Sequence, residues 1–173
     1  MNKSWIANGF TAANALFGGL SIMMSISGEY HVAAICILIA MAADAFDGRV
    51  ARALGTAGPM GVELDSLSDD ISFGVAAGAL MYSYQLRELG ALGFIPCALL
   101  GAFCAFRLAR FNVKVTSVHG YFEGLPCPTV GVIIACYVLS GVKIWNWLAM
   151  VCVLVLAVLM VSEVHYPANK GAS

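Results

Sequence analysis

The sequence is poor in charged residues, which make up 11% of its 173 residues, whereas a typical soluble domain has about 25%. Hydrophobic residues make up 61%, and the mean hydropathy is +0.87. So few polar side chains cannot coat a soluble protein of this size, because too much apolar surface would face water. A formal net charge of −1 also leaves no broad positive field to attract a nucleic acid. The composition therefore indicates an integral membrane protein that does not bind nucleic acid.

Cysteine pairs of the C-x-x-C kind, the usual signature of a zinc or redox site, are absent from the sequence. Most of the six cysteines lie within apolar runs, where a free cysteine acts as a small packing residue. We therefore expect packing cysteines, and neither a disulfide framework nor a zinc site. The six are Cys36, Cys97, Cys104, Cys127, Cys136 and Cys152.

Long apolar runs dominate the chain, and a helix needs about 20 mostly apolar residues to cross a bilayer. The connections between the runs are short, and the sequence contains no internal repeat or interdomain linker. We therefore predict an all-α integral membrane protein of about six transmembrane helices, with a single membrane-embedded domain over residues 1–173. The predicted spans are 8–26, 31–54, 68–84, 90–112, 128–141 and 144–162.

The basic residues predict the orientation, because lysine and arginine favour the cytoplasmic side of a membrane. With six spans, both ends of the chain lie on one side. Seven basic residues fall on that side, whereas only Arg87 and Lys143 fall on the other. We therefore expect both termini to face the cytoplasm, at the cell membrane. The seven are Lys3, Arg49, Arg52, Arg107, Arg110, Lys114 and Lys170.

Six of the ten acidic residues fall between positions 44 and 70. Carboxylates within a membrane are costly and usually functional. Asp44 and Asp47 are three residues apart, and Asp65 and Asp69 are four apart, so each pair shares one helix face. The glycine-rich link between the pairs predicts a turn. Two neighbouring helices are therefore expected to point four carboxylates at one space.

Four carboxylates held together repel one another, so protons or cations must neutralise them. An all-oxygen ligand set suits Mg²⁺, Mn²⁺ or Ca²⁺, as one ion or as two. A simpler interpretation, helix capping or solvated loop charge, fits Asp65 and Asp69 near a helix start. It does not fit Asp44 and Asp47, which lie inside a predicted span. A divalent-cation transporter or channel lined by carboxylates is an alternative that does not involve catalysis.

Small and basic residues flank the carboxylates. Gly48, Ala51 and Gly61 allow a bulky group to approach the backbone, although small residues also pack membrane helices together. Arg49 and Arg52 add donors suited to phosphate. Cations, arginines and an open backbone together indicate phosphoryl chemistry.

The run "DAFDGRVARALGTAGPMGVELDSLSDD" contains the pattern D-x2-D-G-x2-A-R-x8-G-x3-D-x3-D. This pattern resembles the signature of the CDP-alcohol phosphatidyltransferases at every fixed position. The resemblance implies a helical, typically homodimeric membrane enzyme with its site open to the cytoplasm. Such an enzyme transfers a phosphatidyl-type group from a CDP-linked donor to an alcohol and releases CMP.

The resemblance also implies roles for individual residues. Asp44, Asp47 and Asp65 would be ligands of Mg²⁺ or Mn²⁺, and Ca²⁺ is a further candidate ion for the site. Asp69 would be both a ligand and the general base. The first span carries a T-x-x-N pattern similar to that of the family, which adds one residue to the donor-binding set, although interhelical hydrogen bonds would also explain the pattern. The nucleotide- and donor-binding candidates are Asn14, Gly48, Ala51, Arg52 and Gly61.

The acceptor is predicted from three further stretches, "ELDSLSDDISFG", "FRLARFN" and "FEGLPCP". They are similar to those of the family members that use L-serine, although those members often have serine where this chain has Cys127. This similarity implies transfer of the phosphatidyl group from CDP-diacylglycerol to the hydroxyl of L-serine, giving phosphatidylserine and CMP. A sister activity that uses glycerol 3-phosphate or an inositol phosphate is the closer alternative.

A zwitterionic amino acid needs a cation for its carboxylate. Arg107 and Arg110 lie three residues apart at the cytoplasmic end of the fourth span, and Asn112 adds a polar group nearby. We predict that these three residues bind serine. The two arginines have other possible roles, as topology markers or as ligands of lipid phosphate.

Overall fold

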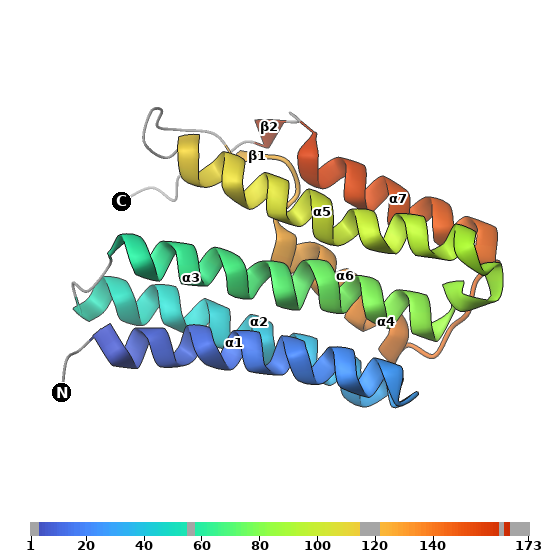
Figure 1. Cartoon of the computed structure of the whole chain (residues 1–173), viewed down its shortest axis with the longest axis horizontal. Helices are drawn as coiled ribbons and strands as arrows, with labels where there is room; N and C mark the ends of the chain where they lie inside the picture. Colours follow the sequence, from blue (N-terminus) through green and yellow to red (C-terminus); the bar gives the residue numbers. More distant parts are fainter. Residues whose placement is uncertain (1–3, 55–57, 115–121, 163–164, 167–173) are drawn as a thin grey trace.

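The computed structural model describes residues 4–54, 58–114, 122–162 and 165–166, and most of them form helices aligned along the long axis of the molecule (Figure 1). Besides the α-helices there are two short helical segments, the π-helix η1 (Asp70–Val75) and the 3₁₀-helix η2 (Leu86–Leu89). The α-helices are α1 (Ser4–Ile26), α2 (Tyr30–Leu54), α3 (Pro59–Asp69), α4 (Ala76–Tyr84), α5 (Ala91–Lys114), α6 (Cys127–Leu139) and α7 (Asn146–Val161).

Helices α3, η1 and α4 follow one another without a break and form a single rod. The rod begins at Pro59, well before the predicted span at 68–84. Gly58 precedes it in an extended conformation (φ −137°), and proline at the first helical position is already set for a helix because its ring fixes φ. The rod therefore extends the third span toward the acidic residues of α2 and carries Asp65 on a helix, as the spacing predicts.

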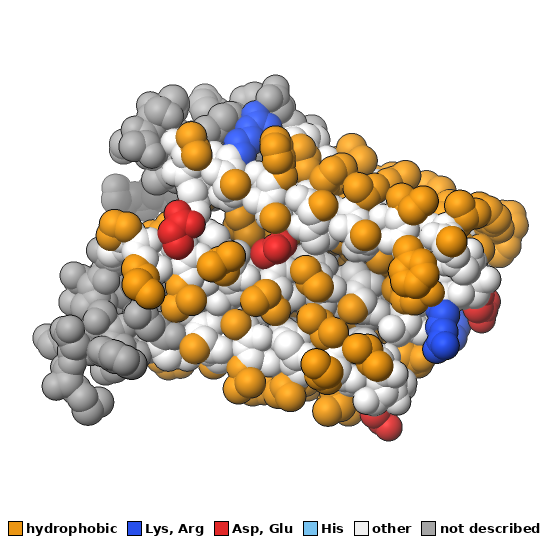
Figure 2. All heavy atoms as spheres, viewed as in Figure 1, with side chains coloured by type: hydrophobic (Ala, Val, Ile, Leu, Met, Phe, Trp, Pro, Cys, Tyr) orange, Lys and Arg blue, Asp and Glu red, His pale blue; other side chains and the backbone are white. Residues whose placement is uncertain are grey.

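The six predicted spans fall on α1, α2, the rod formed by α3, η1 and α4, and then α5, α6 and α7. This agreement confirms an all-α membrane fold. By length and composition, α1, α2 and α5 each contain a segment able to cross a membrane. Helices α6 and α7 are apolar but have only 13 and 16 residues, fewer than the roughly 20 that a full crossing takes. Figure 2 shows apolar side chains along the whole length of one face, with few charged groups among them. Such a surface fits lipid and not water.

The π-helix lies at the centre of the bundle, where it contacts α1, α5 and α6. Its Phe73 is fully buried and packs so closely against α6 that a Cβ on Gly131 would overlap with the ring. Fully buried Ile37, Leu80 and Leu100 extend this core along the neighbouring rods. The segment that follows Asp69 is therefore held on several sides.

One end of the bundle carries a hydrogen-bond network around Gln85, which is 3% exposed at the end of α4. The Gln85 amide nitrogen donates to the carbonyl of Ile144 (2.6 Å) and to Oδ1 of Asn146 (3.1 Å), and the Tyr137 hydroxyl donates to Gln85 Oε1. Both polar atoms of the buried amide are thus satisfied. The network ties the ends of α4 and α6 to the start of α7.

At the opposite end, the segment before α6 is fixed to the segment after α7. Strand β1 (Phe122–Glu123) pairs antiparallel with β2 (His165–Tyr166). Leu125 N–H then donates to the carbonyl of Leu159 at 3.1 Å. Gly124, which lies between β1 and Leu125, has φ +74°, a conformation that favours glycine. A Cβ at this position would also overlap with the backbone of α7. The "FEGLPCP" stretch is thereby anchored just before α6.

All six cysteines are free thiols, as predicted. The packing prediction is confirmed for the four that are buried in the bundle and is wrong for the two that are exposed, because their helix positions face outward. The buried ones are Cys36, Cys97, Cys104 and Cys127, and the exposed ones are Cys136 and Cys152.

Candidate functional site

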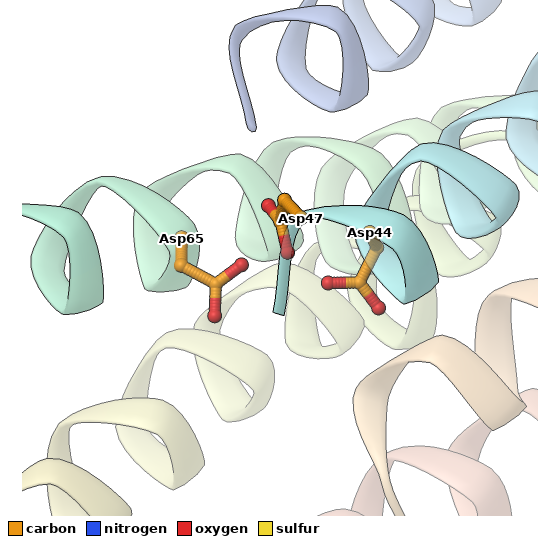
Figure 3. A group of neighbouring side chains, drawn as sticks. All are labelled: Asp44, Asp47 and Asp65. Carbon is orange, nitrogen blue, oxygen red and sulfur yellow. The ribbon is translucent and has the colours of Figure 1, made fainter. Parts of the chain in front are cut away.

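Three carboxyl groups meet between α2 and α3. Asp44 and Asp47 project from one face of α2, and Asp65 projects from α3 toward them (Figure 3). One carboxylate oxygen from each lies within 4.8 Å of the other two. Asp47 is 5% exposed, and the other two are half-buried. The i, i+3 spacing on α2 therefore contributes to the gathering that the sequence predicts, whereas the predicted turn includes residues 55–57, which lie outside the described residues.

These three residues fit a divalent cation. Ionised carboxylates only accept hydrogen bonds, so three of them side by side cannot satisfy one another. Oδ1 of Asp65 is buried and receives no hydrogen bond. A hard cation with oxygen ligands supplies the missing positive charge. The residues present thus fit Mg²⁺, Mn²⁺ or Ca²⁺.

Asp69 lies beside this group, one helical turn after Asp65. Asp69 is 8% exposed, and its carboxyl group interacts with that of Asp44. The side-chain amide of Asn14, on α1, donates to Asp69 Oδ1 at 3.0 Å. The four predicted carboxylates therefore share one region, whereas the ligand and base roles of Asp69 stay predictions.

Helix α1 supplies a second donor, because the Thr11 hydroxyl bonds Asp47 Oδ2 at 2.8 Å. Thr11 and Asn14 are both buried. The T-x-x-N pattern predicts either nucleotide binding or interhelical hydrogen bonds. The structure shows interhelical hydrogen bonds, which both residues make to the acids. Nucleotide binding by Asn14 stays a prediction.

The other donor-binding candidates lie on the same two helices. Gly48 follows Asp47 on α2, and Gly61 lies in the first turn of α3; both are partly buried. Ala51 and Arg52 belong to α2, but their side chains lie outside the described part of the structure. The structure thus brings both glycines to the helices that carry the acids.

Arg107, on α5, reaches the start of α6, where its Nη1 lies 3.8 Å from the sulfur of Cys127. Arg107 Nε is buried and has no hydrogen-bond partner. Cys127 is fully buried and close enough to Asp69 to interact with it. Arg107 therefore borders the acidic region. Sequence reasoning treated Cys127 as a packing residue and as a departure from serine within the acceptor-like stretch "FEGLPCP", and did not predict its contact with Arg107.

The two remaining acceptor candidates also lie on α5. Arg110 is partly buried. Asn112 donates from its amide nitrogen to the hydroxyl of Ser66 at 3.0 Å, which ties the end of α5 to α3. Sequence reasoning missed this contact, because Ser66 carries no signal apart from its position between two acids. Serine binding by Arg107, Arg110 and Asn112 stays a prediction.

Asp70 does not join the acidic group. Successive helical residues point about 100° apart, and the Asp70 carboxyl accordingly interacts with Cys104 on α5. It lies against Gly74, where a Cβ would come within 2.7 Å of Oδ1. Two adjacent aspartates thus have different surroundings.

The comparison with known families agrees with the geometry. The model of the family described as CDP-alcohol phosphatidyltransferase matches residues 4–161, which include every described helix and all four acids. A curated relative from Helicobacter pylori, named CDP-diacylglycerol–serine O-phosphatidyltransferase, is 36% identical over 170 residues, 94% of this chain and 72% of its own length.

Two further relatives come from a bacterium and an archaeon. A CDP-diacylglycerol–serine O-phosphatidyltransferase of Bacillus subtilis is 35% identical, over 92% of this chain and 88% of its own length. An archaetidylserine synthase of Methanothermobacter thermautotrophicus is 38% identical, over 91% of this chain and 67% of its own length. With the acids gathered as the signature requires and a family match over nearly the whole chain, the chain belongs to the CDP-alcohol phosphatidyltransferase family.

Proposed function

We propose that the protein transfers the phosphatidyl group of CDP-diacylglycerol to the hydroxyl of L-serine, giving phosphatidylserine and CMP. The observation that carries the proposal is the meeting of Asp44, Asp47 and Asp65 within 4.8 Å, with Asp69 beside them. The names of the relatives, two for serine transfer from CDP-diacylglycerol and one for an archaetidylserine product, support serine as the acceptor.

In the proposed reaction, Asp69 takes the proton of the serine hydroxyl, which is a weak nucleophile until it loses that proton. The serine oxygen forms a bond to the phosphorus that carries the diacylglycerol. The bond from that phosphorus to the oxygen bridging to CMP breaks, and CMP leaves with the electron pair. Asp44, Asp47 and Asp65 would hold Mg²⁺ or Mn²⁺, as one ion or two, with Asp69 as a further ligand. A bound divalent cation neutralises the diphosphate and stabilises charge on the leaving group.

The substrates are assigned to two sets of residues. Arg107 offers a buried, unpartnered Nε beside the acids, a donor suited to the serine carboxylate. Arg110 and Asn112, one turn further along α5, complete the proposed acceptor set. The CMP portion of the donor is assigned to the small and polar residues on α1, α2 and α3. They are Asn14, Gly48, Ala51, Arg52 and Gly61.

The proposed setting is the cytoplasmic membrane, with both termini and the acidic site facing the cytoplasm. Residues 1–173 would form a single catalytic domain, and two copies a homodimer. The apolar outer surface of the bundle supports direct exchange of lipid with the bilayer, so that the acyl chains leave the site sideways between helices (Figure 2).

A CMP-release assay with an acceptor panel tests the proposal. The purified protein in lipid nanodiscs receives CDP-diacylglycerol and Mg²⁺ or Mn²⁺, with L-serine, glycerol 3-phosphate or an inositol phosphate. We expect L-serine to stimulate CMP release and mass spectrometry to find phosphatidylserine. Stimulation by another acceptor alone would assign the sister activity. Absence of donor turnover with every acceptor would refute a transferase and favour a cation pathway.

Arg107→Ala is expected to raise KM for L-serine by about 10- to 100-fold, because a hydrogen bond to a charged group contributes about 1.5–3 kcal/mol. KM for CDP-diacylglycerol should change by less than about threefold on the same scale. Initial rates at varied serine and varied donor separate the two constants.

Arg87→Ala is the matched control, because Arg87 is exposed on η2, at the end of the bundle away from the acids. Its two constants should stay at the wild-type values. If Arg107→Ala instead raises KM for the lipid donor alone, Arg107 binds lipid phosphate and the serine assignment is wrong.

A further inference from the structure

The orientation of Asp69 depends on a helix that carries none of the four acids. Asn14 on α1 is completely buried, and its amide is the donor to Asp69 Oδ1. The carbonyl oxygen of the same amide, Asn14 Oδ1, is buried without a hydrogen-bond partner. No hydrogen bond on that side of the amide fixes its direction. The place of Asn14 is therefore set by how the α1 backbone lies against the rod that bears Asp69.

Ser72 fixes that backbone at the same residue. Its hydroxyl donates to the main-chain carbonyl of Asn14 at 2.9 Å, and both residues are 0% exposed. Ser72 lies on the π-helix, three residues after Asp69. Asn14 is thus held twice by the same rod, through its side chain at Asp69 and through its main chain at Ser72.

Gly18 makes this close approach possible. A Cβ at Gly18 would overlap with the Ser72 hydroxyl and would lie 2.9 Å from the Ser72 Cα, a main-chain atom that cannot easily move. Gly18 follows Asn14 by one helical turn on the same face of α1. Any larger residue there would push α1 off the rod and draw the Asn14 amide away from Asp69.

We propose that Ser72, seated against Gly18, is a positioning residue that holds Asn14 and thereby orients the Asp69 carboxyl toward the acceptor hydroxyl. Ser72 touches no substrate and acts only through Asn14. The inference rests on the proposed transferase activity, in which Asp69 is the base. The rod after Asp69 thus contributes to catalysis as well as to packing.

Ser72→Ala tests the inference in the nanodisc assay with CDP-diacylglycerol and L-serine. We expect kcat to fall about tenfold, the scale of one lost buried hydrogen bond, while KM for L-serine stays within about twofold. Ser68→Ala is the matched control. Ser68 is equally buried on the same rod and also bonds a main-chain carbonyl, but that of Leu64 in its own helix. It should keep the wild-type kcat.

A double-mutant cycle separates positioning from a general loss of structure. In an Asn14→Ala background, Ser72→Ala should change kcat by less than about twofold, because the residue through which Ser72 acts is gone. The same tenfold loss in both backgrounds, or an equal loss in Ser68→Ala, would overturn the inference.

Thermal unfolding in detergent shows whether each variant folds. If Ser72→Ala does not fold, Ser72→Cys, which keeps the size and a weak donor, should give a smaller drop in kcat at unchanged KM; a wild-type kcat in Ser72→Cys would overturn the inference. A wild-type protein without serine-dependent CMP release would refute the proposed function itself, a result distinct from any of these.

Discussion

Asp69→Asn is expected to lower kcat for serine-dependent CMP release by about a thousandfold, within the 10²–10⁴ range of general-base catalysis. An amide has the size of a carboxyl group but cannot take up the hydroxyl proton. Its oxygen still accepts the hydrogen bond that Asn14 donates at 3.0 Å in the wild type, so the local packing is retained. Steady-state rates at saturating serine and donor measure the loss.

The adjacent Asp70 offers a close control, because its carboxyl interacts with Cys104 and not with the acidic group. Asp70→Asn removes one acid from the same rod and should leave kcat within about threefold of wild type, the usual range for a change away from the reacting groups. Comparable losses of kcat in both variants would show that turnover depends on the negative charge of the rod and does not depend on a base at Asp69. An active Asp69→Asn enzyme would remove Asp69 from the proposed reaction.

Removal of divalent metal is expected to abolish activity. With EDTA in excess, CMP release should fall at least about a hundredfold, because a cation that stabilises transferring phosphate contributes several kcal/mol. Addition of Mg²⁺ or Mn²⁺ beyond the chelator should restore it. The physical reason is the set of three carboxylates within 4.8 Å, one with a buried oxygen that receives no hydrogen bond.

The same metals should raise the midpoint of thermal unfolding, because an ion that binds only the folded protein stabilises it by mass action. This readout needs no substrate. Asp47→Asn should require more metal for half-maximal activity and show a smaller thermal shift. A Ca²⁺ arm tests whether an ion binds without supporting turnover. Full activity in EDTA, or equal thermal shifts in wild type and Asp47→Asn, would contradict a metal site at these residues.

The sequence alone predicts much of the fold, because each of the six spans contains an apolar run, although the third helical segment begins at Pro59, before its apolar part. It also predicts the meeting of the acids, since helix spacing and a glycine-rich turn suffice for residues that are close along the chain. Asp44 and Asp65 lie on helices that follow each other along the chain, and local spacing rules predict their meeting.

Contacts between distant helices were not predictable in this way. The bonds from Asn14 to Asp69 and from Ser72 to Asn14 depend on how α1 is rotated against the third rod. A soluble helix reveals its inner face by its polar outer face, but a membrane helix is apolar on both. The contact of Arg107 with Cys127 was missed for the same reason.

The π-helix η1 could not be predicted from the sequence either. A wider turn of this kind has no compositional signature, and it arises where packing on several sides favours it over the regular turn. Its location just after Asp69, with Phe73 pressed against Gly131, becomes visible only in the assembled bundle.

The network around Gln85 has a consequence for how substrates reach the acidic site and how products leave it. Among the described residues, fully buried Leu80 and Leu100 lie in the core, and Gln85, which is 3% exposed, uses its amide nitrogen to bond Ile144 and Asn146 at the far end of α4. For the proposed reaction we therefore expect serine and CMP, both soluble in water, to use the end of the bundle where the acids lie, and the donor and product lipids to occupy the leaflet at that end. We then expect new phosphatidylserine to enter one leaflet first and to need a separate flipping step to reach the other.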